Sequence, residues 1–250
     1  MRYVIKVCYD GTNFCGWQVQ QGQRTVQDEL NTAVRRAFGE RTPVVASGRT
    51  DSGVHALGQV CHFDMIKEFP VSKVADAMNY YLPEDVSVVE CVQGEEGFDA
   101  NRSAKKKTYV YSLYCSPRRN PLKDRYAVRI NYMPNIAKMK KCASLFVGEH
   151  DFSAYCASGS QVKTTERTVY SFTVEECNGD IKITVCGNGF LYNMVRTLVG
   201  TLLGFASGKL SEEDIQNSLN FGDRTLVGKT MPPQGLCLYS VDYGKQLFQG

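Results

Sequence analysis

The sequence predicts an α+β protein with two ferredoxin-like halves, in each of which a strand, a helix, two strands, a helix and a strand follow one another. Short runs of alternating apolar and polar residues, typical of half-buried strands, are interspersed with segments whose apolar residues recur every three or four positions, typical of helices. The order of these segments in the first half is repeated in the second. The 250 residues, 43% of them hydrophobic, are enough for one large domain or two small ones.

The first half contains the six elements of one ferredoxin-like unit. Thr25 is expected to cap the first helix, with Asp28 three residues later completing a capping box, and Gly39 is expected to end it. Ser72 is expected to cap the second helix, which Pro83 ends. The expected elements are, in chain order, a strand over residues 3–9, a helix over 26–38, strands over 43–46 and 58–65, a helix over 73–82 and a strand over 86–92.

The second half repeats this order and adds a short helix. Asn178-Gly179 predicts a tight hairpin turn. The expected elements are a strand over residues 107–115, a helix over 134–146, hairpin strands over 168–177 and 181–186, an apolar helix over 190–206, a short helix after Ser211 and a strand over 235–243. The predicted halves are residues 1–100 and 101–250, with antiparallel or mixed sheets on either side of a central, positively charged cleft.

The most informative stretch is the loop between the strands expected over 43–46 and 58–65, which reads Gly48-Arg49-Thr50-Asp51-Ser52-Gly53-Val54-His55-Ala56. Asp51 has a cation two residues away and no other carboxylate within ten residues on either side. A nearby positive charge favours the ionised carboxylate, which can be a nucleophile, a base or a metal ligand. The alternative is an Asx-turn, in which Asp51 only caps its own loop.

Two residues of the second half are further candidates for chemistry. Arg196 lies in the most apolar expected helix, where a guanidinium is usually paired with a carboxylate such as Asp51, unless it extends to the surface. Tyr109 follows three consecutive lysines. It is expected to stack on a base or to move a proton, the alternative being a half-buried strand residue.

Basic residues gather in one part of the chain, although the net charge is only +3. They are Lys105, Lys106, Lys107, Arg118, Arg119, Lys123, Arg125, Arg129, Lys138, Lys140 and Lys141. Three tyrosines, at positions 109, 111 and 114, follow the first block of three lysines. Basic side chains for phosphates and rings for bases indicate nucleic-acid binding, and a solvated basic face is the alternative.

The sequence has no pattern for a metal, a cofactor or a membrane span. Its ten cysteines include no Cys-x-x-Cys pair, and its three histidines are dispersed. No run of eighteen apolar residues is present, and the N-terminus lacks the apolar core of a signal peptide. A cytoplasmic protein is therefore expected.

The Asp51 loop resembles the active-site motif of tRNA pseudouridine synthases of the TruA type. Other motifs of that family are matched in the family's order: Tyr9-Asp10-Gly11-Thr12, Gly16-Trp17-Gln18, Thr25-Val26-Gln27, Gly58 to Phe63, Lys107 to Tyr111, Phe190 to Arg196 and Pro233 to Leu238. The matches extend from Tyr3 to Tyr243. Two places depart from the family pattern: Ser52 stands where Ala is common, and Arg102 is one position later than expected.

The resemblance implies a two-lobed α+β fold, a homodimer, no cofactor, and conversion of uridine to pseudouridine at nucleotides 38, 39 and 40 of the tRNA anticodon stem-loop. By position, Asp51 is expected to be the nucleophile, Arg196 its ion-pair partner, and Tyr109 an active-site tyrosine. The residues expected to contact the substrate are Arg49, His62, Tyr109 and Leu236.

Two other kinds of function remain open from the sequence. A non-catalytic RNA-binding relative of the same fold would stack bases on strand aromatics, but it would not require Asp51, Tyr109 and Arg196 together. A hydrolase with an aspartate nucleophile would have no use for the lysines at 105–107. The residues do not decide whether Asp51 attacks C6 of the base or C1′ of the ribose, or acts as a base.

Overall fold

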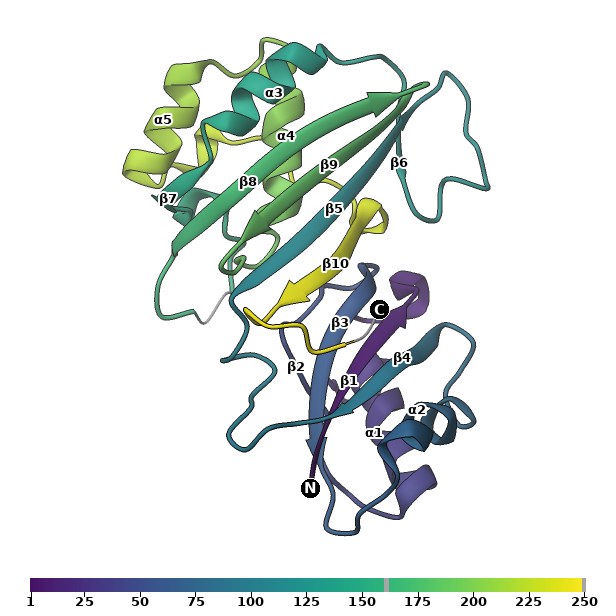
Figure 1. Cartoon of the computed structure of the whole chain (residues 1–250). Coiled ribbons are helices and arrows are strands. Elements are labelled where there is room, and N and C mark those ends of the chain that lie inside the picture. The colour runs from purple at the N-terminus through teal and green to yellow at the C-terminus, as the bar shows by residue number, and fades with distance from the viewer. Residues whose placement is uncertain (160–161, 249–250) are drawn as a thin grey trace. The chain divides into compact units, whose positions relative to one another are not determined.

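The computed structural model describes residues 1–159 and 162–248. Contacts divide the chain into two compact units: unit 1 comprises Met1–Lys107 and Cys237–Gly250, and unit 2 comprises Thr108–Leu236. Each unit consists of strands with helices packed on them, which confirms the predicted α+β class (Figure 1). The predicted halves, residues 1–100 and 101–250, are each continuous in sequence. The contacts instead group the residues from Cys237 onward with unit 1.

Unit 1 has the element order that the first half predicts. Its elements are β1 (Arg2–Tyr9), α1 (Val26–Phe38), β2 (Val45–Ala46), β3 (His55–Asp64), α2 (Val71–Asn79), β4 (Val86–Gln93) and β10 (Leu236–Asp242). The strand order is β4-β1-β3-β10, and the short β2 pairs with β3. Strand β1 runs antiparallel to β3 and β4, whereas β10 runs parallel to β3, so the sheet is mixed.

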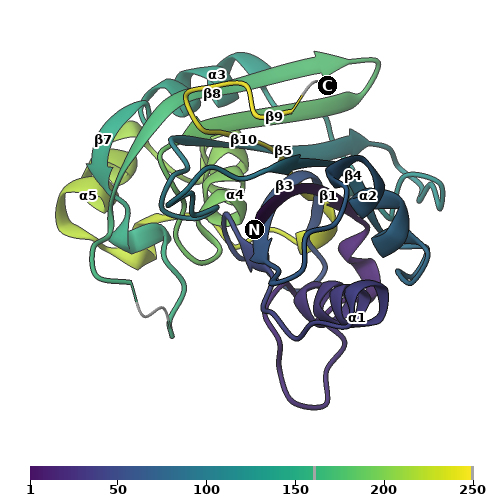
Figure 2. The same cartoon turned by 60° about the horizontal axis from the view of Figure 1, so that its bottom comes forward.

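Alternation along β1 decides which side chains meet the helices of unit 1. Tyr3 stacks on Phe63 of β3, whose ring also stacks on Phe38 at the end of α1. Helices α1 and α2 lie on this face of the sheet (Figure 2). On the other face, Val4 and Val60 pack with a cluster formed by the segment after β4 and the residues after β10.

Unit 2 is likewise built of strands covered by helices. Its elements are β5 (Lys106–Cys115), β6 (Val128–Ile130), α3 (Ile136–Ser144), β7 (Gly148–Asp151), β8 (Glu166–Cys177), β9 (Asp180–Gly187), α4 (Met194–Ala206) and α5 (Glu212–Phe221). The strand order is β5-β9-β8-β7, with β6 parallel to β5. The predicted hairpin is confirmed, because Asn178 and Gly179 have φ angles of 51° and 84°.

The predicted starts of three helices differ from the structure in position or in capping, and a fourth is confirmed. Thr25 precedes α1, but its buried hydroxyl lacks a hydrogen-bond partner among the described residues, so the predicted capping box is wrong. Ser72 lies inside α2, which begins at Val71 after Pro70. Helix α4 begins at Met194 rather than at residue 190, because Asn193 before it is left-handed, with φ 61°. The expected cap at residue 211 is confirmed, as a full capping box.

Candidate active site

The predicted Asp51 loop connects β2 to β3 in unit 1. Asp51 is partly exposed and Arg49 is exposed. Gly53 has φ +77°, a left-handed conformation in which glycine is favoured, and it lets the chain turn back into β3. At the start of the loop, the Lys107 Nζ donates a hydrogen bond to the Ser47 carbonyl, 2.6 Å away. One member of the predicted basic block therefore contacts the loop itself.

The segment of residues 9–17, which begins at the last residue of β1, packs against this loop. The Trp17 N–H donates to the Thr50 carbonyl at 3.0 Å, and the Gly53 N–H donates to the Phe14 carbonyl at 3.3 Å. The Ser52 hydroxyl donates to the same Phe14 carbonyl at 3.1 Å. Backbone on both sides of Asp51 is therefore held by the 9–17 segment.

His55, at the end of the loop, is tied to the same segment. Its Nδ1 accepts a hydrogen bond from the Gly11 N–H at 3.0 Å and lies 3.2 Å from Asp10 Oδ1. The Asp10 carboxylate also accepts a hydrogen bond from the Thr12 N–H at 3.0 Å. The sequence predicts no role for His55 or Asp10, although Tyr9-Asp10-Gly11-Thr12 matches a motif of the family.

Arg196, on the first turn of α4 in unit 2, is hydrogen-bonded within its own unit. Its Nε donates to the Met231 carbonyl at 2.6 Å, and its Nη1 donates to Asn193 Oδ1 at 2.5 Å. The Met231 N–H donates back to the Arg196 carbonyl at 3.2 Å. The guanidinium thus connects the start of α4 to the segment before β10, and its pairing with Asp51 stays a prediction.

Tyr109 lies on β5 and is only 8% exposed, with its ring edge-on to Phe190 at 5.3 Å between centroids. Two residues along the strand, the fully buried Tyr111 donates its hydroxyl to the Pro232 carbonyl at 2.7 Å. Burial raises the pKa of Tyr111 well above its usual value, against the smaller opposing effect of the Arg196 cation.

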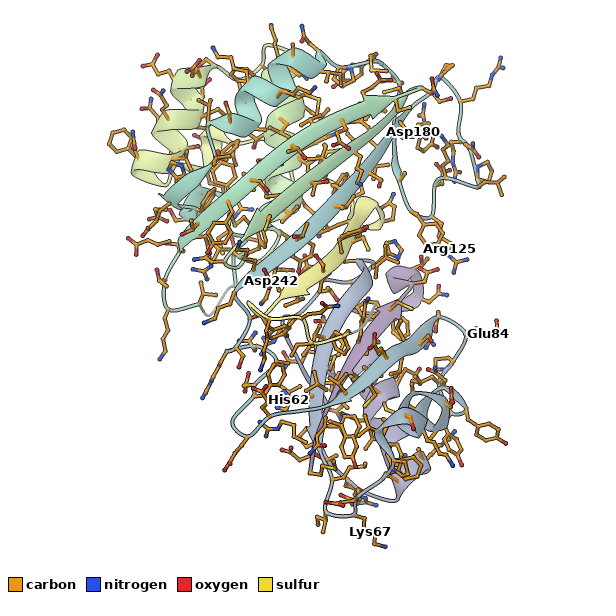
Figure 3. The ribbon with its side chains drawn as sticks, in the orientation of Figure 1. His62, Lys67, Glu84, Arg125, Asp180 and Asp242 are labelled. Carbon is orange, nitrogen blue, oxygen red and sulfur yellow. The ribbon has the colours of Figure 1, made fainter. Side chains whose placement is uncertain are left out.

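Two residues expected to contact substrate lie in the interior. Leu236, the first residue of β10, is 5% exposed. His62, on β3 (Figure 3), is also 5% exposed, and its Nδ1 accepts a hydrogen bond from the Ala100 N–H at 3.1 Å. Burial, and secondarily the Arg2 cation, lower the pKa of His62, so it is neutral at pH 7. Their roles toward a substrate stay predictions.

The basic segment between β5 and β6 is partly engaged in intramolecular contacts. Arg119 pairs with Asp124 at 2.7 Å, and Lys123 pairs with Asp180 at 2.5 Å. Arg118 and Arg125 are exposed in the same segment, which Figure 3 shows with Arg125 labelled. This segment therefore offers fewer cations to phosphates than the sequence suggested.

The tyrosines expected to stack on bases need a correction. Tyr111 and Tyr114 are 0% and 3% exposed, and the Tyr114 hydroxyl donates to Asp124, so neither ring is available to a base. The exposed rings near the basic residues are instead Tyr126 and Tyr132, at 52% and 47% exposure. Both flank β6, a strand that the sequence did not predict, so neither ring was considered there.

The described residues contain no group of three or more His, Cys, Asp or Glu side chains that could hold a metal ion. Nor does any helix within residues 1–159 and 162–248 reach the length and apolar character needed to cross a bilayer. All ten cysteines are free.

Comparisons with known proteins identify the family of this chain. A family model described as tRNA pseudouridine synthase matches residues 6–100 and 142–244, which include Asp51 and Arg196. The tRNA pseudouridine synthase A of Shouchella clausii is 43% identical over 99% of this chain and 95% of its own length. The protein of that name from a Thermoanaerobacter species is 44% identical over 96% of this chain and 98% of its own length. The one from Bacillus subtilis is 42% identical over 97% of this chain and 99% of its own length. The chain belongs to the tRNA pseudouridine synthase family.

Proposed function

We propose that this enzyme, an isomerase of tRNA uridines, acts on nucleotides 38, 39 and 40 of the anticodon stem-loop with Asp51 as its nucleophile. The observation that carries the proposal is the Asp51 loop, whose backbone is hydrogen-bonded on both sides of a partly exposed carboxylate. A held carboxylate suits the reaction, in which the uracil–ribose C–N bond breaks, the base turns, and its C5 bonds to the sugar.

The reaction needs the target base outside the helix, at a cost of a few kcal/mol. Phosphate contacts and stacking of about 1–3 kcal/mol per base offset that cost. Arg49 is proposed to contact the extruded nucleotide, since it is exposed two residues before Asp51. The isomerisation transfers no electrons and requires no redox cofactor.

The remaining assignments are proposals supported by position in the family motifs. Arg196 is proposed to pair with Asp51, and Tyr109, His62 and Leu236 to contribute to substrate binding. The active protein is proposed to be a cytoplasmic homodimer, because its substrate is tRNA and the resemblance implies a dimer.

The proposal is tested by incubating the protein with unmodified tRNA and mapping pseudouridine at each position. Pseudouridine at 38, 39 and 40 supports it, and pseudouridine at other positions would overturn the anticodon stem-loop assignment. Binding of tRNA without any pseudouridine would favour the non-catalytic RNA-binding alternative.

A further inference from the structure

We infer that Tyr9 is a positioning residue for Asp51: its hydroxyl, bonded to Thr50, fixes the loop backbone next to the nucleophile in the reactive arrangement. The inference rests on the proposed function of Asp51 and adds to it a residue that does not itself touch the reacting atoms.

The first observation is a buried hydroxyl pair. The Tyr9 hydroxyl lies 2.7 Å from Thr50 Oγ1, and the two residues are only 5% and 7% exposed. Buried polar groups almost always have a partner, and leaving one unpaired costs about 1–3 kcal/mol. Thr50, which directly precedes Asp51, also receives the Trp17 N–H on its carbonyl. Its side chain and its backbone are therefore both held from the 9–17 segment.

The second observation is how closely this segment lies against the loop. Gly16 has φ +90°, and a Cβ there would lie 2.9 Å from the Thr50 carbonyl oxygen and 3.2 Å from the Ser52 nitrogen. A Cβ on Gly11 would lie 2.0 Å from the Val54 carbonyl oxygen. Only glycine fits at these two contacts, so the loop backbone is packed against the segment on both sides of Asp51.

Tyr9 is itself held in place by the sheet. It is the last residue of β1, paired with Ala56 of β3 on one side and Val86 of β4 on the other. Its ring also contacts the ring of Trp17, with 6.3 Å between centroids. The Tyr9 hydroxyl therefore connects a fixed position in the sheet to the residue before the nucleophile. Because a displacement of about 1 Å at a reacting group can cost about 100-fold in rate, loss of this bond should affect catalysis.

The test compares two Tyr→Phe substitutions, each of which removes a hydrogen bond between a buried tyrosine hydroxyl and a second hydroxyl. In unit 2, the Tyr155 hydroxyl lies 2.7 Å from Ser218 Oγ and both residues are buried, at 0% exposure, so Tyr155→Phe is the control. Single-turnover rate on tRNA, tRNA affinity and thermal midpoint are measured for both. Tyr9→Phe is expected to lower the rate about 10–100-fold with tRNA affinity unchanged. Both substitutions are expected to lower the thermal midpoint by similar amounts, because each removes one buried hydroxyl pair. Only Tyr155→Phe is expected to leave the rate unchanged.

A second pair of variants keeps the inference testable if Tyr9→Phe does not fold. Thr50→Val removes the partner hydroxyl at nearly constant volume and should lower the rate as Tyr9→Phe does. Thr50→Ser keeps a hydroxyl and should restore most of the rate. The inference is overturned if the variants without the hydroxyl pair react at the wild-type rate, or if Tyr155→Phe loses as much rate as Tyr9→Phe. If wild type forms no pseudouridine, the proposed function itself fails, whereas an active wild type with an equally active Tyr9→Phe removes only this inference.

Discussion

Arg196→Met should destabilise unit 2, because the arginine side chain makes two hydrogen bonds there. The substitution removes the hydrogen bonds from Nε to the Met231 carbonyl and from Nη1 to Asn193 Oδ1. It leaves an apolar side chain of comparable length in the same helix, so the loss is mainly polar. The left-handed Asn193 at the start of α4 loses the interaction that holds its side chain.

The magnitude follows from the two bonds. A hydrogen bond to a charged group contributes about 1.5–3 kcal/mol, and Arg196 is half-buried, so the lower end applies to each bond. The free energy of unfolding should fall by about 3 kcal/mol. For a chain of this size, the corresponding drop in thermal midpoint is about 6–12 °C. Arg196→Lys should recover about half of it, because one ammonium does not reproduce the two-pronged geometry.

The assay is thermal and urea unfolding followed by circular dichroism. Arg36→Met is the matched control, because it removes an exposed arginine from α1 and should change the stability by no more than about 0.5 kcal/mol. If Arg196→Met unfolds at the same midpoint as Arg36→Met, the two hydrogen bonds do not stabilise unit 2 and this reasoning is refuted.

Two further predictions concern pH and salt. The pKa of His62 is lowered below 6.5 in the folded state, so its contribution to stability is complete above pH 6.5 and is lost as the pH falls toward the folded pKa. His62→Asn keeps an acceptor for the Ala100 N–H and should flatten the fall in stability between pH 7.5 and pH 5 in urea titrations; an unchanged pH profile would exclude His62 as its source. Affinity for tRNA should fall with salt with a log–log slope of about −3, for three or four neutralised phosphates; a flat dependence would exclude electrostatic docking.

Local patterns predicted the fold well where neighbours in sequence decide the structure. The Asn178-Gly179 hairpin and the cap at Ser211 depend on residues within a few positions, and both are confirmed. The parallel pairing of Leu238 with Ala56 could not be predicted, because nothing local specifies a partner strand so far away in the chain. The sequence marked Tyr111 as a ring for bases, but it did not show that this ring is buried.

In the candidate site, too, local features could be predicted from the sequence and contacts between distant segments could not. Asp51 stands out in the sequence because its loop is compact, polar and bounded by glycines. The hydroxyl pair of Tyr9 and Thr50 joins residues 41 positions apart, so it follows from the packing of the 9–17 segment and not from any spacing in the sequence. The hydrogen bond of Arg196 to Met231 likewise required the fold, since the sequence suggested either a carboxylate partner or an arginine that extends to the surface.

If the Asp51 carboxylate is the nucleophile, Asp51→Asn should abolish pseudouridine formation. Asn keeps the shape of the side chain and removes its charge and its nucleophilic oxygen. The measurement is pseudouridine formation at nucleotides 38, 39 and 40 alongside tRNA affinity, with Asp28→Asn on the exposed face of α1 as the matched control. A nucleophilic Asp51 predicts that Asp51→Asn forms no product and binds tRNA with an affinity close to wild type, and that Asp28→Asn is fully active. Turnover by Asp51→Asn within about tenfold of wild type would contradict this prediction, since loss of a nucleophile costs far more than that.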